Sequence, residues 1–274
     1  MLNAKGYLWG LALLRRGPMA RCGFVVFLFL LLVSAAFGQN PPPSNPQAVS
    51  LASQSIAALT AGTAISDATL TGSVTWSGGT TPQTGTATLL ASGTGESRMN
   101  LAFPAGTWTE IRDASTGVAL GEWIAPSGAS GMFAFQNCAT DAVWFFPVLG
   151  SLAAGPNVVL SYVGQETRNG GEAVQHIQSY VYQSNSTAQQ WSTMDFYLDA
   201  TTLLPSAVTF NAHPDNFAAA NLLVEVDFSN YQTLNGVMVP TQIQRSLQGN
   251  VLVSITVTGA SFNTGLPLSD FIIN

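Results

Sequence analysis

Charged side chains are scarce in this sequence of 274 residues, since only 8% are Asp, Glu, Lys or Arg, whereas 47% are hydrophobic. This composition excludes a disordered chain, because it provides enough apolar surface to bury a core. The 14 acidic residues outnumber the 8 basic ones, which leaves a net charge of −6. A nucleic-acid partner is therefore excluded, because binding to phosphates needs a basic surface.

The residues that carry most catalytic and metal chemistry are also few. The sequence contains no G-x-S-x-G turn, no phosphate-binding loop and no G-x-G-x-x-G motif that opens a helix. His176 and His213 stand far apart, without the neighbouring His or Cys ligands that a metal site requires. His176 is interpreted as a histidine on a sheet surface, and His213 as part of a loop. We therefore predict no catalytic residues, no metal site and no cofactor.

Pairs of carboxylates are a further candidate, because two of them at one site are typical of glycoside hydrolases. Asp195 and Asp199 alternate with apolar residues in one segment, and Glu225 and Asp227 do the same in another. Such alternation is typical of the solvated face of an amphipathic strand. A secreted hydrolase is accordingly the least favoured of the function hypotheses.

The first 38 residues have the features of a secretory signal peptide. An apolar run of 13 residues spans positions 24–36, and small residues surround the expected cleavage point after Gly38. Four basic residues precede the run: Lys5, Arg15, Arg16 and Arg21. The run is shorter than the roughly 20 residues of a membrane span, although an uncleaved N-terminal anchor stays open as the alternative. The long basic segment also leaves Met1 or Met19 as the start.

Cleavage would leave a strongly acidic chain with a single cysteine. Four arginines and no lysine would then stand against all 14 acidic residues, so the net charge would be −10. Such a protein is repelled by anionic lipid surfaces. Cys138 has no partner for an internal disulfide, and we interpret it as a small buried residue rather than as a nucleophile. The predicted location is periplasmic or otherwise extracytoplasmic.

A proline-rich linker, residues 39–46, precedes a single predicted domain that spans residues 47–274. Asn45 and Pro46 form a typical helix start, and apolar residues follow at helical spacing until Gly62. The domain is therefore predicted to open with one amphipathic helix.

After Gly62 the apolar residues recur at every second position. We expect about nine strands in an antiparallel sheet with one covered face. Glycine-containing turns separate the runs, for example Asn235-Gly236, and no strand–helix–strand rhythm is present. The predicted fold class is mainly β (α+β).

One segment, residues 140–150, is apolar on all sides and breaks this pattern; it is interrupted by Pro147, where a second helical turn can begin and run towards Gly155. It is predicted to form a short helical plug that either fills the open face of the sheet or forms part of a lipid-facing mouth. The large apolar residues of this segment and of the nearby strands are the candidate ligand-binding residues: Trp144, Phe145, Phe146, Trp76, Met99 and Phe103.

The C-terminal half contains several turn patterns in a fixed order. They are a hairpin at residues 163–170, an Asp, Leu-Pro, x-x-Val pattern at 196–208, a Tyr, Asn-Gly, Val-x-Val-Pro pattern at 228–240, and a last strand and tail at 255–271. In these patterns the chain resembles the LolA-like proteins, the superfamily of the outer-membrane lipoprotein carrier. The opening helix and the strands of residues 63–112 match the order of elements in that family more loosely.

This resemblance implies a strongly curved antiparallel sheet, an incomplete β-barrel, whose concave apolar face is covered by helices and holds acyl chains. The favoured hypothesis is an exported, non-enzymatic protein that binds a lipid or a lipoprotein acyl chain on this concave face. The alternative is an envelope module that has a filled interior and binds a protein partner instead of a lipid. We do not predict that this protein acts as a carrier, because an acidic chain is a poor match for a shuttle that docks on anionic membranes.

Overall fold

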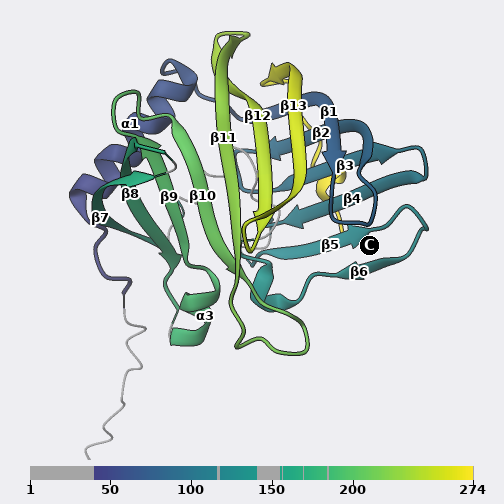
Figure 1. Ribbon diagram of the computed structural model, residues 1–274. Helices are drawn as coiled ribbons and strands as arrows, with labels where there is room; N and C mark the ends of the chain where they lie inside the picture. Colours follow the sequence, from purple (N-terminus) through teal and green to yellow (C-terminus); the bar gives the residue numbers. More distant parts are fainter. Residues whose placement is uncertain are drawn as a thin grey trace, which may run out of the picture. The chain divides into compact units, whose positions relative to one another are not determined.

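The computed structural model describes residues 40–115, 118–140, 155, 157–168, 170–183 and 185–273. Its described strands form one antiparallel sheet in the order β6-β5-β4-β3-β2-β1-β13-β12-β11-β10-β9-β8-β7 (Figure 1). Strands β1 to β6 therefore follow one another from the middle of the sheet to one edge. Strands β7 to β13 follow one another from the other edge back to the middle. The two parts of the sheet meet where β1 pairs with β13.

These two parts are consecutive meanders of hydrogen-bonded neighbours. The N-terminal meander consists of β1 (Asp67–Trp76), β2 (Gln83–Ser92), β3 (Ser97–Phe103), β4 (Gly106–Asp113), β5 (Leu120–Ile124) and β6 (Ser130–Met132). The C-terminal meander consists of β7 (Val158–Arg168), β8 (Glu172–Val181), β9 (Met194–Asp199), β10 (Pro205–Ala212), β11 (Leu222–Leu234), β12 (Val237–Leu247) and β13 (Asn250–Phe262).

Helix α1 (Pro46–Thr60) begins as the sequence predicts. The Asn45 side chain accepts hydrogen bonds from the backbone N–H groups of Gln47 and Ala48, at 2.9 and 3.1 Å. Ala61 and Gly62 end the helix with positive φ angles of 51° and 80°. The helix contacts β7 and β12, so it covers part of the same sheet face that carries the hydrophobic core.

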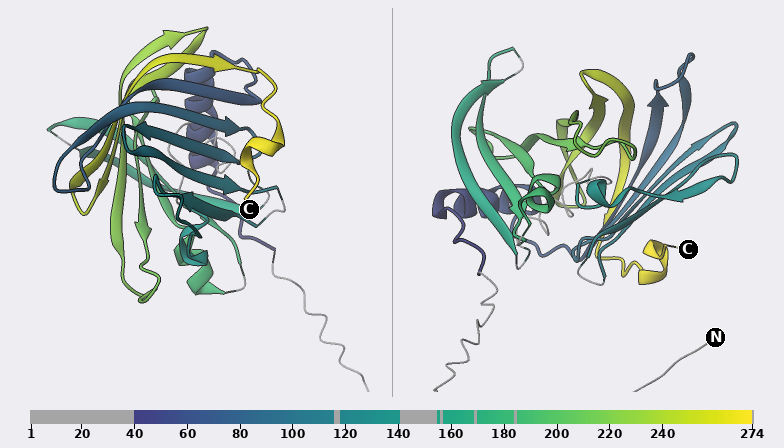
Figure 2. Two further views of the ribbon diagram at one scale, coloured as in Figure 1. Left: turned by 90° about the vertical axis from the view of Figure 1, so that its right-hand side faces the viewer. Right: turned by 90° about the horizontal axis from the view of Figure 1, so that it is seen from below.

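The core lies on one face of the sheet, and the sheet curves around it. Leu70, Val74, Phe196, Val226 and Ile255 belong to one buried cluster together with residues of α1. In the right-hand view of Figure 2 the blue N-terminal strands and the green C-terminal strands form two opposing walls of an open barrel. This confirms the predicted fold class, a mainly β protein with a strongly curved, incomplete barrel.

The outer face of the N-terminal meander is partly covered by the C-terminal tail. The short helix η2 (Leu268–Phe271) contacts β3 and β4 and buries Phe271. Arg98 Nη1 donates a 3.2 Å hydrogen bond to the Asp270 carbonyl. The tail therefore shields the side of these strands that faces away from the core.

The prediction of about nine strands was wrong, because the described part of the chain contains thirteen. Two features lower the number of strands that alternation reveals. Charged residues occupy core-side positions of β4 and hide its alternation, and β6 is only 3 residues long. The predicted signal peptide and most of the predicted plug lie outside the described residues. Within the described part, no helix is long and apolar enough to span a membrane.

Candidate functional site

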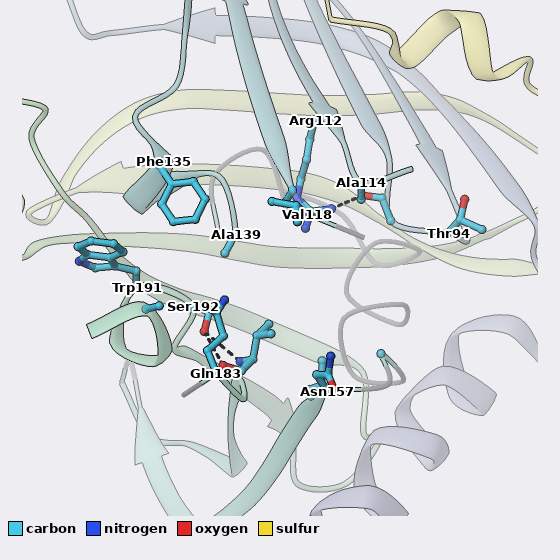
Figure 3. A pocket seen from close by; sticks show the side chains of 16 residues that line it. Thr94, Arg112, Ala114, Val118, Phe135, Ala139, Asn157, Gln183, Trp191 and Ser192 are labelled. Carbon is cyan, nitrogen blue, oxygen red and sulfur yellow. Dashed lines mark hydrogen bonds between the residues drawn. The ribbon is translucent and has the colours of Figure 1, made fainter. Parts of the chain in front are cut away.

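A cavity of about 280 Å³ lies between the two walls of the open barrel (Figure 3). The N-terminal meander and its loops contribute Thr94, Gly95, Arg112, Ala114, Val118 and Ala119. The opposite wall contributes Val158, Val181, Gln183, Ala188, Trp191 and Ser192. Most of the lining is apolar, so the cavity is suited to a small apolar group.

Arg112 is the charged residue of this lining, and only 4% of it is exposed. It lies on β4 opposite Ser97 of β3, on the core side of the sheet. Its Nε donates a 3.3 Å hydrogen bond to the Cys138 carbonyl, and its Nη1 donates to the Gly95 carbonyl. Two neutral carbonyl groups therefore hold a buried cation in place.

Burial lowers the pKa of Arg112 to about 10, and the negative charge of Glu96 partly opposes this shift. Glu96 is itself buried, and its carboxylate accepts a hydrogen bond from the Thr94 hydroxyl. Within the described part of the structure, the Glu96 carboxylate does not form a contact ion pair with Arg112. Arg112 consequently stays positively charged at neutral pH.

Two aromatic rings line one end of the cavity. Phe135 of the short helix η1 (Phe135–Asn137) meets Trp191 of α3 (Ser186–Trp191) edge to face, with 6.3 Å between ring centroids. Asn137 exchanges two hydrogen bonds with the backbone of His213, at 2.7 and 2.8 Å. This pair anchors η1 to the loop that connects β10 and β11, and it fixes Phe135 at the cavity.

The sequence-predicted apolar residues take a different place. Met99 is buried in the core at 6% exposure, and Trp76 and Phe103 are half-buried against the same core. None of these three residues lines the cavity. The predicted residues Trp144, Phe145 and Phe146 lie outside the described residues, so their part in ligand binding stays a prediction.

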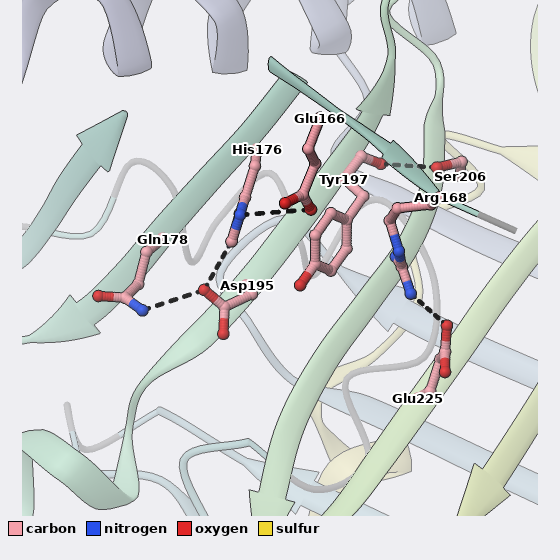
Figure 4. A network of polar contacts seen from close by, with 8 residues as sticks. All are labelled: Glu166, Arg168, His176, Gln178, Asp195, Tyr197, Ser206 and Glu225. Atoms are coloured by element: carbon pink, nitrogen blue, oxygen red, sulfur yellow. Dashed lines mark hydrogen bonds and ion pairs between the residues drawn. The ribbon is translucent and has the colours of Figure 1, made fainter. Parts of the chain in front are cut away.

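A second group of polar residues lies on the outer face of the C-terminal meander (Figure 4). His176 Nε2 lies 2.8 Å from Asp195 Oδ1, and its Nδ1 lies 3.5 Å from Glu166 Oε1. Arg168 stacks on the Tyr197 ring at 3.7 Å and pairs with Glu225. We call these residues, together with Asp227, the outer-face network.

The carboxylates of this network occupy the outer face, as the alternation predicts, but several are less solvated than expected. The Asp195 and Glu225 side chains are 25% and 23% exposed. Burial and the neighbouring Glu225 carboxylate raise the pKa of Asp227 to about 6, although Arg168 opposes the shift. Asp199 instead stabilises a turn, because it accepts hydrogen bonds from the backbone of Thr201 and Thr202. These contacts within the chain are enough to account for the four carboxylates as structural residues.

The cavity residues were not predicted, although one signal for them exists in the sequence. Trp108, Glu110 and Arg112 alternate with Ile111 and Thr109, so two charged residues share a face with a large aromatic one. Only the pairing of Glu110 with Met99 and of Arg112 with Ser97 shows that this face is the inner one. Within the described part of the chain, no cluster of three or more potential metal ligands is present.

Comparisons with known proteins agree with this architecture at the level of structure. No protein-family model and no curated protein matches the sequence. A domain from Vibrio parahaemolyticus, described as an outer membrane lipoprotein-sorting protein, has 13% identity and a TM-score of 0.53; the alignment covers 82% of this chain and 96% of that one. A LolA superfamily protein from Nitrosomonas europaea has 12% identity and a TM-score of 0.52, with 82% and 97% coverage.

The chain has a LolA-like fold. A DUF1329 family protein from Desulfovibrio piger supports the same assignment, with 12% identity, a TM-score of 0.55 and coverage of 84% of this chain and 98% of that one. The fold that the sequence resemblance implies is thereby confirmed. At these identities the likeness defines the LolA-like fold, and the function has to be argued from the site.

Proposed function

We propose that this protein is an exported, non-enzymatic binding protein that holds the acyl chain of a lipid or lipoprotein on the concave side of its LolA-like sheet. The observation that carries the proposal is the largely apolar cavity between the two walls, which adjoins the core through Val158. Its volume of about 280 Å³ is close to the lower end of the range for ligand sites, roughly 300–1,000 Å³. It suits one short chain or the end of a longer one.

The alternative, an envelope module with a filled interior that binds a protein partner, also has an observation in its favour. Helix α1 and the buried cluster occupy much of the concave face, and Met99 and Leu101 are part of that packed core. A filled interior would leave protein contacts as the main activity of the molecule. The two proposals differ in whether the cavity accepts an acyl chain.

The test is displacement of a fluorescent fatty-acyl probe from the purified protein, with Ala188→Phe as the blocking variant. Ala188 lines the cavity and is buried on α3, so a phenyl ring there takes up space that a ligand would need. We expect saturable probe binding to the wild type and at least a tenfold loss of affinity in the variant. Ala219→Phe adds the same ring on an exposed loop and should leave binding unchanged.

An absence of saturable binding to the wild type would favour the module with a filled interior. Native mass spectrometry after gentle purification, followed by lipid extraction, identifies any ligand that the protein retains. Trp144→Ala and Phe145→Ala, measured in the same assay, test the predicted role of these two residues.

Export belongs to the same proposal and has its own test. We expect cleavage after Gly38, because a basic segment, an apolar run and small residues precede Gln39. N-terminal sequencing of protein from the envelope fraction should begin near Gln39. A start at Met1 or Met19 would instead indicate the uncleaved anchor.

A further inference from the structure

We propose that the cavity is specific for an amphiphile with an anionic headgroup, and that Arg112 binds the headgroup while the apolar lining binds the chain. This inference rests on the proposed function and names the class of ligand for that site. Its basis is the unusual state of Arg112, a buried cation at the wall of an otherwise mainly apolar cavity.

A buried charge is costly unless an opposite charge and hydrogen bonds compensate for it. A guanidinium group has five N–H donors, and the Gly95 and Cys138 carbonyls receive hydrogen bonds from only Nη1 and Nε. Within the described residues, Nη2 makes no hydrogen bond and no carboxylate is in ion-pair contact with the group. Arg112 therefore retains donor capacity at the cavity wall.

Geometry favours an oxygen anion over a neutral polar group. The planar guanidinium matches two oxygens of a carboxylate or phosphate, and such charge-assisted pairs are roughly twice as strong as neutral hydrogen bonds. The two backbone carbonyls hold the side chain of Arg112 in one orientation, so little further ordering is needed on binding. Phe135 and Trp191, also part of the lining, offer apolar surface for a chain.

Glu96 provides an independent test of the same idea. Its buried carboxylate offsets the charge of Arg112 electrostatically, and it would also repel an incoming anion. Glu96→Gln keeps an oxygen that can accept the hydrogen bond from the Thr94 hydroxyl but removes the negative charge. This substitution should therefore improve binding of an anionic amphiphile and leave a neutral one unaffected.

The experiment compares decanoate, decyl phosphate and decanol, which share one chain length, by displacement of the fatty-acyl probe. We expect the two anions to bind the wild type at least tenfold more tightly than decanol. Arg112→Gln should reduce their affinity to that of decanol, Arg112→Lys should preserve part of it, and Glu96→Gln should raise it several-fold. The ratio of decanoate to decyl phosphate distinguishes a carboxylate ligand from a phosphate ligand.

Arg98→Gln is the matched control, because Arg98 lies on the adjacent strand β3 and hydrogen-bonds Asp270 on the outer face. It should change none of the affinities. Equal binding of decanoate and decanol to the wild type and to Arg112→Gln would overturn the headgroup assignment while the acyl-chain proposal stands. Failure of all three compounds and the probe to bind would overturn the proposed function itself. If Arg112→Gln does not fold, Glu96→Gln decides: unchanged anion affinity contradicts the inference.

Discussion

Two largely buried arginines occupy opposite walls of this molecule, and their surroundings differ. Arg168, on the outer face of the C-terminal meander, stacks on the Tyr197 ring and pairs with Glu225. Arg112, on the inner face of the N-terminal meander, donates to two backbone carbonyls and lines a cavity. The partners of Arg168 are side chains of its own meander, and its Nη1 is buried on the outer face without a hydrogen bond to the described residues. The partners of Arg112 are backbone carbonyls, and its free donors lie at the cavity.

The difference separates a structural cation from one that is available to a ligand. The outer-face network links β7, β8, β9 and β11 through side chains, so its charges hold strands together. The hydrogen bonds of Arg112 instead fix its own orientation. A buried charge is therefore informative about function only after its partners have been identified.

The largest expected effect on stability is that of Arg168→Met. This change leaves Glu225 and Asp227 without their nearby cation, so we expect a loss of about 2 kcal/mol, somewhat less than for a fully buried ion pair. Arg112→Gln should cost about 1 kcal/mol, because it removes hydrogen bonds but no contact ion pair. Urea melts at neutral pH measure both values. If Arg112→Gln lowers stability more than Arg168→Met, then Arg112 has the mainly structural role of the two arginines.

The pH dependence of stability should show a smaller effect that arises from Asp227. Its pKa rises from an ordinary value of 3.8 to about 6 in the folded protein, so the folded state binds more protons than the unfolded state between these values. The contribution of Asp227 to stability is complete below about pH 4 and is lost as the pH rises through about 6. Asp227→Asn should remove this decline and stabilise the protein by about 1 kcal/mol at pH 7, after allowance for solvent screening.

Urea melts of the wild type and Asp227→Asn at intervals between pH 4 and pH 8 provide the measurement. Arg168→Met should steepen the decline, because Arg168 is the group that opposes the rise of this pKa. If the free energy of unfolding depends on pH in the same way for the wild type and Asp227→Asn, the outer-face network does not raise the pKa of Asp227.

Cys138→Ser should have an effect of similar size on stability and none on binding. Cys138 supports Arg112 through its backbone carbonyl, and its thiol lies 3.4 Å from the Ala134 carbonyl, to which a serine hydroxyl can also donate. We expect a loss on the order of 1 kcal/mol from the burial of a more polar group, with no change in decanoate affinity. Loss of binding without loss of stability would restore the thiol as a functional group.

Local signals in the sequence were sufficient for the elements that depend on neighbouring residues. The Asn45-Pro46 helix start and the Asn235-Gly236 turn, with φ angles of 50° and 83°, are examples. The LolA-like fold was recognised from similar turn patterns. Conversely, alternation gives a weak signal for strand β4, because Glu110 and Arg112 occupy core-side positions, where alternation predicts apolar residues.

The cavity was beyond sequence reasoning for a different reason. Arg112, Gly95 and Cys138 meet only after strands and loops have been placed, and Trp191 reaches the same cavity from the opposite wall. No spacing along the chain encodes these distances. The size of Trp76 and Phe103 does not by itself distinguish a core residue from a ligand contact, so their part in ligand binding stays a prediction.

The pairing of β1 with β13 has a consequence for how the chain folds. Ser66 donates a hydrogen bond to Asn263, 197 positions later in the sequence, whereas every other pair of adjacent strands is also consecutive along the chain. Hairpins form within microseconds, but contacts between distant segments must first overcome a large loss of chain entropy. The two meanders should therefore form early and join late. Until they join, β1 and β13 each present an unpaired edge, and a chain with this topology is most exposed to aggregation during that interval.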